Sequence, residues 1–263
     1  MINIVVCLKQ VTDPEAPASA YAVDAEAKQV ILKGIPPVIS PFDENALEAA
    51  LRIKDIQESK ITVISLGRSL SRPVLLKALA AGADELILLE DEAFERLDGQ
   101  ATARVLIAAI GRLGKPDLIL TGRQAADTNA GVVGFGIAEL LGLPVVSVAR
   151  KVEIKDGWAR VERVIPDGYE VIEAPLPLLV TVSNELGQLR YPSMQQLVAA
   201  RKKPVTTWRA ADLGLESKPI GRLQLRDLFI PQREVGRCDM VTGESPEEMG
   251  ANLALKLREA HLL

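Results

Sequence analysis

Short, continuously apolar runs alternate with amphipathic segments along the first half of the chain. The apolar runs are typical of strands buried on both faces, and the amphipathic segments repeat their apolar residues at helical spacing. The predicted strands are Ile4–Leu8, Ile61–Leu66, Leu86–Leu89 and Leu118–Leu120. One predicted helix starts at Ser40–Asp43 with Ser40 as its N-cap, and the others cover Val74–Ala81, Ala101–Leu113 and Val132–Leu141. Strands that alternate with helices form a mostly parallel sheet, so the pattern predicts an α/β fold of the Rossmann-like or flavodoxin-like kind.

The pattern changes after residue 144. Residues Lys151–Lys155 and Trp158–Val164 flank the turn Asp156–Gly157, which is typical of a β-hairpin, and Leu178–Val182 is expected to be the last buried strand. Residues 184–245 show little periodicity, and the chain closes with an amphipathic helix over Glu247–Glu259 that Ser245-Pro246 is expected to cap. The sequence therefore predicts an α/β sheet with a hairpin excursion and a C-terminal arm plus helix.

The segment 122–134 holds the strongest candidate for a ligand site. It joins a strand to a helix through small residues, and this geometry lets backbone amides and a helix dipole hold a phosphate. The spacing fits neither the dinucleotide-binding nor the P-loop motif, so a plain tight turn is the alternative. Because ligands bind at the carboxyl ends of parallel strands, we expect the loops after residues 8, 66 and 121 to share one crevice with this segment.

Composition and charge limit the classes of function that the sequence supports. A net charge of −4 argues against nucleic acid as the main partner. The only histidine is His261, near the C-terminus, and the two cysteines, Cys7 and Cys238, show no metal-ligand spacing. No nucleophile motif or carboxylate pair stands out, so we expect no metal and no catalytic residue, but a protein that binds a cofactor carrying its own chemistry. The absence of a targeting pattern or a long apolar run predicts a cytoplasmic location.

Five motifs in order resemble those of the β subunit of electron transfer flavoprotein. The segment 6–11 is similar to the family's V-x-V-K-x-V, and 40–54 is similar to N-P-x-D-x-x-A-(I/L)-E-x-A-x-x-(L/I)-K. The segment 76–84 is close to (R/K)-x-A-L-A-M-G-A-D, and 122–127 matches the loop motif. Residues 177–182 and 189–193 are similar to P-A-V-x-T-V followed by P-R-Y-x-(S/T).

The resemblance implies an obligate heterodimer with an α subunit that carries a redox-active FAD. Electrons would pass between flavin-dependent dehydrogenases, of the acyl-CoA dehydrogenase type, and a quinone-linked acceptor. The β subunit would be an electron carrier and not an enzyme, with an AMP of its own. In a bifurcating branch a second FAD replaces the AMP and NADH supplies electrons. A more distant alternative is a standalone adenine-nucleotide-binding regulatory protein of the universal-stress type.

By resemblance, the nucleotide is held at three strand ends and a helix start. The implied cofactor-binding residues are Cys7, Ser40, Pro41, Phe42, Asp43, Leu66, Gly122, Arg123, Gln124, Ala125, Ala126, Asp127, Thr128, Asn129, Ala130, Gly131, Val132, Val133 and Gly134. The AMP-binding form carries Asn-Gln-Thr where this chain has 131–133, and Val133-Gly134 matches half of the A-Q-V-G-P of the bifurcating branch. AMP and FAD therefore both stay open.

The resemblance also divides the chain into three parts. Residues 1–183 would form the nucleotide-binding domain with its hairpin extension. Residues 184–203 look like a recognition segment in which Tyr191 and Met194 dock the partner dehydrogenase. Residues 204–263 would form an arm and helix that contact the α subunit.

Overall fold

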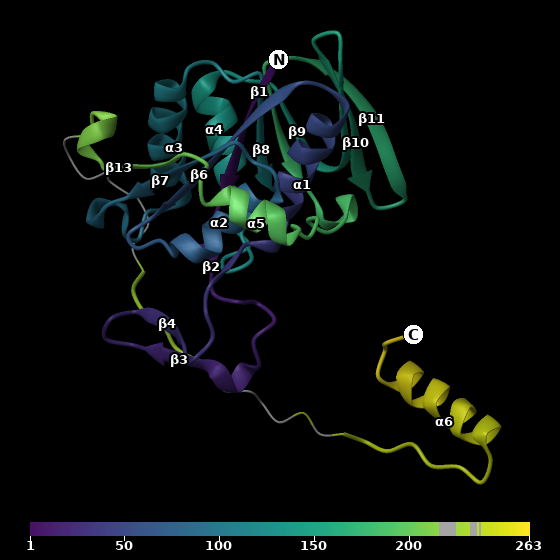
Figure 1. Ribbon diagram of the computed structural model, residues 1–263. Helices are drawn as coiled ribbons and strands as arrows, with labels where there is room; N and C mark the ends of the chain where they lie inside the picture. The colour runs from purple at the N-terminus through teal and green to yellow at the C-terminus, as the bar shows by residue number, and fades with distance from the viewer. Residues whose placement is uncertain (216–224, 232–235, 237) are drawn as a thin grey trace. The chain divides into compact units, whose positions relative to one another are not determined.

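The computed structural model describes residues 1–215, 225–231, 236 and 238–263 (Figure 1). The chain divides into two compact units, Met1–Asp227 and Leu228–Leu263. The first unit contains the whole sheet together with the segment 184–203, and the second contains the C-terminal helix.

One sheet of nine strands dominates the first unit, in the order β11-β10-β9-β12-β8-β1-β6-β7-β13 (Figure 1). Seven of these strands run parallel, while β10 and β11 extend one side as an antiparallel ribbon. The strands are β1 Ile2–Leu8, β6 Ser59–Gly67, β7 Glu85–Glu90, β8 Leu118–Gly122, β9 Val145–Lys155, β10 Trp158–Ile165, β11 Gly168–Pro175, β12 Leu178–Val182 and β13 Val205–Trp208. The predicted α/β class and the predicted hairpin are confirmed.

Helices cover both faces of the sheet. Apolar side chains of α1 (Pro41–Ile56) and α2 (Arg72–Ala81) form one core with alternate strand residues, and those of α3 (Gly99–Leu113) and α4 (Val133–Leu141) form the other. Consecutive residues of a strand point to opposite faces, so Val6 belongs to the first core and Cys7 to the second. The short helix α5 (Met194–Ala200) lies beside α2.

Two parts of the fold depart from the sequence prediction. The segment expected to be irregular contains β13, which pairs in parallel with β7, and its four half-exposed residues are too short for a periodic signal. The loop after β1 contains the paired short strands β2 (Gln10–Val11) and β5 (Val38–Ile39), and a separate hairpin of β3 (Tyr21–Asp24) and β4 (Gln29–Leu32). The single-turn helices are η1 Ala18–Ala20, η2 Glu92–Phe94, η3 Asn184–Leu186 and η4 Ala211–Leu213.

The second unit contains α6 (Pro246–Glu259). The Ser245 hydroxyl accepts a hydrogen bond from the amide of Glu248 at 3.2 Å, which confirms the predicted cap. Met249 and Leu253, on the apolar side of this helix, are 39% and 47% exposed. Across the described ranges, no helix has both the length and the apolar character needed to cross a bilayer.

The strand order fixes where a ligand can enter. The chain leaves β1 and crosses over through α1 to β6, then returns through α3 to β8 on the opposite side of β1. Because the crossovers before and after this reversal lie on opposite faces, a crevice opens beyond the carboxyl end of β1.

Candidate nucleotide site

A cavity of about 470 Å³ opens at this crevice. Its floor is formed by the ends of β1, β6 and β8, and one wall is the loop that leads from β8 into α4. The three strand-end loops that the sequence assigned to one crevice therefore do meet. The volume lies within the range usual for small-molecule sites.

Most of the residues expected to bind the cofactor line this cavity. They are Cys7, Asp43, Leu66, Gly122, Arg123, Gln124, Ala125, Thr128, Ala130, Gly131, Val132, Val133 and Gly134. The other expected residues, Ser40, Pro41, Phe42, Ala126, Asp127 and Asn129, do not line it. Of these six, Ser40 contacts the loop through the amide of Ala126, and Asp127 and Asn129 bond to Lys9 and Gln124, which line the cavity.

A second wall was missed from the sequence. It comes from the loop after β7 and the first turns of α3, and it comprises Phe94, Arg96, Leu97, Asp98, Gly99, Thr102 and Leu106. The sequence did contain one signal for this wall. The loop follows the third predicted strand, and the loops that follow parallel strands all lie at the same edge of the sheet. Gly99 brings the wall close to the loop, because a Cβ atom there would lie 2.4 Å from Cγ2 of Val132.

The loop is held from behind by polar contacts. The Lys9 ammonium forms an ion pair with Asp127 at 2.7 Å, and the amide side chain of Gln124 donates to Asn129 at 2.9 Å. Ser40 is the N-cap residue of α1, as predicted, but the expectation that its side chain caps the helix is wrong. Its buried hydroxyl forms no cap bond and instead accepts from the amide of Ala126 at 3.3 Å, so it supports the loop.

Asp43 closes the floor of the cavity. Its two carboxylate oxygens accept hydrogen bonds from the amides of Lys9 at 2.8 Å and Gly122 at 3.0 Å. Burial raises the pKa of Asp43 to about 7, and the hydrogen bonds and the Lys9 charge counteract only part of this shift. This carboxyl therefore titrates in the neutral range.

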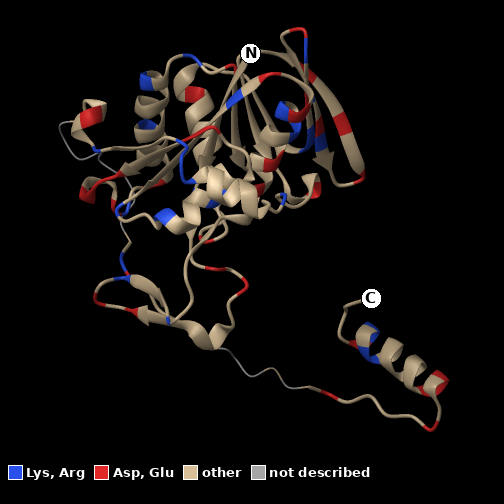
Figure 2. Cartoon of the chain, in the orientation of Figure 1, with Lys and Arg blue, Asp and Glu red and all other residues tan. Residues whose placement is uncertain are grey.

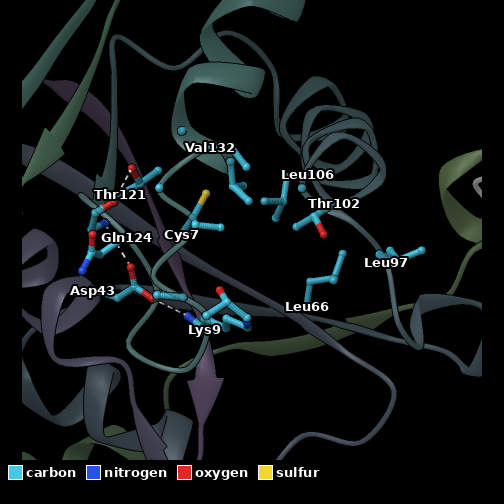
Figure 3. A pocket seen from close by; sticks show the side chains of 18 of the residues that line it. Cys7, Lys9, Asp43, Leu66, Leu97, Thr102, Leu106, Thr121, Gln124 and Val132 are labelled. Atoms are coloured by element: carbon cyan, nitrogen blue, oxygen red, sulfur yellow. Dashed lines mark hydrogen bonds between the residues drawn. The ribbon is translucent and has the colours of Figure 1, made fainter. Parts of the chain in front are cut away.

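Cys7 lies in the middle of the floor (Figure 3). Burial, together with the nearby Asp43 charge, raises the pKa of its thiol to about 12. A thiol that stays protonated is a poor nucleophile, so Cys7 acts here as a small apolar surface.

The two helices that start at the cavity differ at their first turns. The Asp98 carboxylate caps α3 by accepting from the amide of Ala101 at 2.8 Å. In α4 the residue before the helix is Val132, which provides no side-chain cap, and Val133 and Gly134 line the cavity. The first amides of α4 are thus available to an anion, whereas α3 already carries a carboxylate.

The two ends of the cavity differ in their lining, because the large apolar side chains gather at one end. Asp43, Thr121 and Gln124 gather on one side of Cys7, and Leu66, Leu97 and Leu106 lie on the other (Figure 3). A ligand that fits both ends has a charged, hydrogen-bonding part and a flat or apolar part. Together with the switch-point position and the open start of α4, these features make the cavity a candidate nucleotide site in an α/β domain.

Comparison with known proteins identifies the family. A model of the electron transfer flavoprotein domain matches residues 29–213. The caffeyl-CoA reductase–Etf complex subunit CarD of Acetobacterium woodii is 38% identical over the full length of both chains. Electron transfer flavoprotein β subunits of Clostridium acetobutylicum and Thermoanaerobacterium thermosaccharolyticum are 37% and 42% identical, covering 100% and 84% of this chain and 100% and 83% of their own. The chain belongs to the electron transfer flavoprotein family and matches its β subunits, which are electron-carrier subunits and not catalytic enzymes.

Proposed function

We propose that this chain is the β subunit of a heterodimeric electron transfer flavoprotein and holds an adenine nucleotide in the switch-point cavity. The α subunit would carry the redox-active FAD and accept electrons from a flavin-dependent dehydrogenase of the acyl-CoA dehydrogenase type. A quinone-linked oxidoreductase would receive them. The family assignment leaves no role for the universal-stress alternative.

The observation that carries the nucleotide proposal is the open first turn of α4. Its amides line a cavity wall without a side-chain cap, next to the backbone of Gly131 and Val132. A phosphate there would take hydrogen bonds from the amides and favourable charge from the helix dipole. At α3 the Asp98 carboxylate already accepts from a first-turn amide, so the phosphate belongs at α4.

The apolar end suits the adenine ring. Leu66, Leu97 and Leu106 provide a surface on which a base can be buried, and Cys7 fills the space between the base and the polar end. Thr102 adds a hydroxyl beside this surface, as a base with polar edges requires. The residues present therefore fit an adenine nucleotide.

The chemistry of electron transfer comes from flavin when it is bound. The part that this chain contributes is binding and orientation: α4 and the loop before it hold the phosphate, the leucine surface holds the base, and Asp43 fixes the floor between them. No step in this proposal needs a titrating protein group to exchange a proton with a substrate.

A second FAD in place of AMP is the alternative within the same site. The full-length similarity to CarD, a subunit of a caffeyl-CoA reductase–Etf complex, is the observation for which we propose a bifurcating role with NADH as the second candidate function. AMP and FAD share the adenosine and its first phosphate, so both fit the contacts described above.

The segment before α5 is proposed as the dehydrogenase-docking surface. Tyr191 and Met194 are 93% and 75% exposed, and α5 carries no charged residue (Figure 2). The segment is held by Arg190, whose guanidinium donates to Glu48 and Asp55 of α1 at 2.8–3.0 Å. Exposed apolar residues on a rigid support can bind a partner tightly, because little conformational entropy is lost on docking.

The second unit is proposed as the contact to the α subunit. The uncovered apolar residues of α6, Met249 and Leu253, would pack against that partner. A helix with one apolar side gains most of its stability from such packing.

A nucleotide count tests the proposed function. The chain is co-expressed with its α subunit, the heterodimer is purified, and nucleotides released by acid are counted by mass spectrometry. One FAD and one AMP per heterodimer are expected of a simple carrier, and two FAD would assign the bifurcating alternative. A chain that yields no adenine nucleotide, or that forms no heterodimer, contradicts the proposal.

A further inference from the structure

The Asp43 carboxylate connects the ends of two neighbouring strands. One oxygen accepts the amide of Lys9, directly after β1, and the other accepts the amide of Gly122, the last residue of β8. The side chain comes from a third element, the first turn of α1, and is 7% exposed. Three elements of the cavity floor therefore meet at one charged group.

The two amides that Asp43 holds also set the nucleotide-binding loop. Gly122 begins the loop that runs to the start of α4, and the Lys9 side chain holds the middle of that loop through Asp127. The fit at Gly122 is close, because a Cβ atom there would lie 2.6 Å from Asp43 Oδ1 and 2.7 Å from the Phe42 carbonyl carbon. A shift of the Asp43 carboxylate is therefore passed directly to the loop.

We propose that Asp43 is the positioning residue of this site: by accepting from both strand-end amides, its carboxylate holds the loop and the start of α4 where they bind the nucleotide phosphate. This inference rests on the proposed function and gives Asp43 a role in which it acts on the ligand through the backbone of the loop. Asp43 is not a catalytic residue.

A consequence is that binding depends on pH. The charged or titratable groups that face Asp43 are the Lys9 ammonium, the Asp127 carboxylate and the Cys7 thiol. Burial raises the pKa of Asp43 to about 7, so the ionised form that accepts both amides is lost as the pH falls through neutrality. A protonated carboxyl carries an O–H donor and cannot accept at both oxygens, so one strand-end amide loses its partner.

The test uses the heterodimer freed of nucleotide and titrated with AMP and, separately, with FAD at pH 8 and pH 6. In Asp43→Asn, the side-chain NH₂ faces one of the amides, and losing one bond to a charged acceptor is expected to weaken binding about tenfold or more at pH 8. Wild-type affinity should fall by a similar factor at pH 6. For FAD, the affinity of Asp43→Asn should not depend on pH in this range. For AMP, the variant should keep only the pH dependence that comes from the AMP phosphate itself, which titrates near pH 6.

Asp117→Asn is the matched control. Asp117 also joins β1 and β8 through a carboxylate-to-amide bond, to Asn3 at 2.8 Å, but at the opposite end of the strands. This variant should bind within about twofold of wild type and keep the wild-type pH profile, since additivity holds for distant sites.

The results of these titrations decide whether Asp43 is the positioning residue. If Asp43→Asn binds FAD like Asp117→Asn, with the wild-type pH profile, the assignment of Asp43 is overturned. If Asp43→Asn does not fold, the wild-type FAD profile decides: a fall toward pH 6 supports the proposal and a flat profile overturns it. A wild-type heterodimer that binds neither AMP nor FAD overturns the proposed function itself, which is a different result.

Discussion

Helix α1 carries two buried carboxylates in opposite electrostatic surroundings, one at the nucleotide site and one at the proposed docking segment. Asp43 is 7% exposed and Glu48 is 5% exposed. Burial raises the pKa of Asp43 to about 7, since its acceptor bonds to two neutral amides offset only part of the desolvation. Burial also raises the pKa of Glu48, but hydrogen bonds from Arg190 and Arg52 outweigh it and leave the pKa below its ordinary value.

The difference teaches that burial alone does not set the charge of a carboxylate. Glu48 receives a guanidinium in bidentate geometry, with Arg190 Nε and Nη2 each 3.0 Å from a carboxylate oxygen. Asp43 has the Lys9 amide as its partner, while the Lys9 ammonium is committed to Asp127. The ion pair holds the segment at Arg190 on α1 at all neutral pH values, whereas Asp43, whose hydrogen bonds come from two neutral amides, changes protonation near neutral pH.

The largest expected effect on stability comes from breaking the ion pair between Arg190 and Glu48. Arg190→Gln leaves Glu48 buried without its main cation, so the free energy of unfolding should fall by about 2 to 3 kcal/mol in urea titrations at neutral pH. Arg52→Gln is the control, because Arg52 also contacts Glu48 but its side chain is 47% exposed. This control should cost about 0.5 kcal/mol or less, and equal losses for the two variants would contradict the comparison.

The pH dependence of stability should separate the two carboxylates. Because the folded-state pKa of Asp43 is about 7 against an ordinary 3.8, the folded chain binds the proton more tightly, and this group's contribution makes the unfolding free energy fall as pH rises between these values. The expected slope is about 1 kcal/mol for each pH unit in the middle of that window.

Glu48 has the opposite sign. Its lowered pKa gives stability that is present above its ordinary pKa of 4.5 and is lost as the pH falls through the folded value. Urea titrations of the nucleotide-free full-length chain across both windows measure the two slopes. Asp43→Asn should remove the slope only in the upper pH range, and Glu48→Gln should remove it only in the lower range. A variant that removes the slope in the other range would contradict the assignment of these two slopes to Asp43 and Glu48.

The smallest expected effect on stability is at the exposed surface of α5. Met194 is 75% exposed, so Met194→Ala should change the free energy of unfolding by less than about 0.5 kcal/mol. The KM for an acyl-CoA dehydrogenase from the same organism should rise about tenfold with little change in kcat, because an anchor residue dominates docking energy. Gln195→Ala, on the same helix, serves as the control, and an equal rise in its KM would exclude Met194 as an anchor.

Much of the candidate nucleotide site could be predicted from local pattern. The apolar runs located β1, β6 and β8, and the rule that parallel strands end at one edge placed their loops together. The wall from Phe94 to Gly99 was missed because its residues share no motif and enter the cavity through the position of β7 and α3. The hydroxyl of Ser40 was assigned to its own helix, although it bonds a residue that lies 86 positions away.

The sequence by itself determined the α/β class, the hairpin excursion and the family, because hydrophobic periodicity and ordered motifs are local properties of the chain. Tertiary structure alone decided what each polar group does. Asp43 and Glu48 lie on one helix with similar burial, and their opposite pKa shifts depend on partners at Gly122 and Arg190, which are 79 and 142 residues distant. Electrostatic partners are chosen by distance in space, and spacing along the chain does not encode that distance.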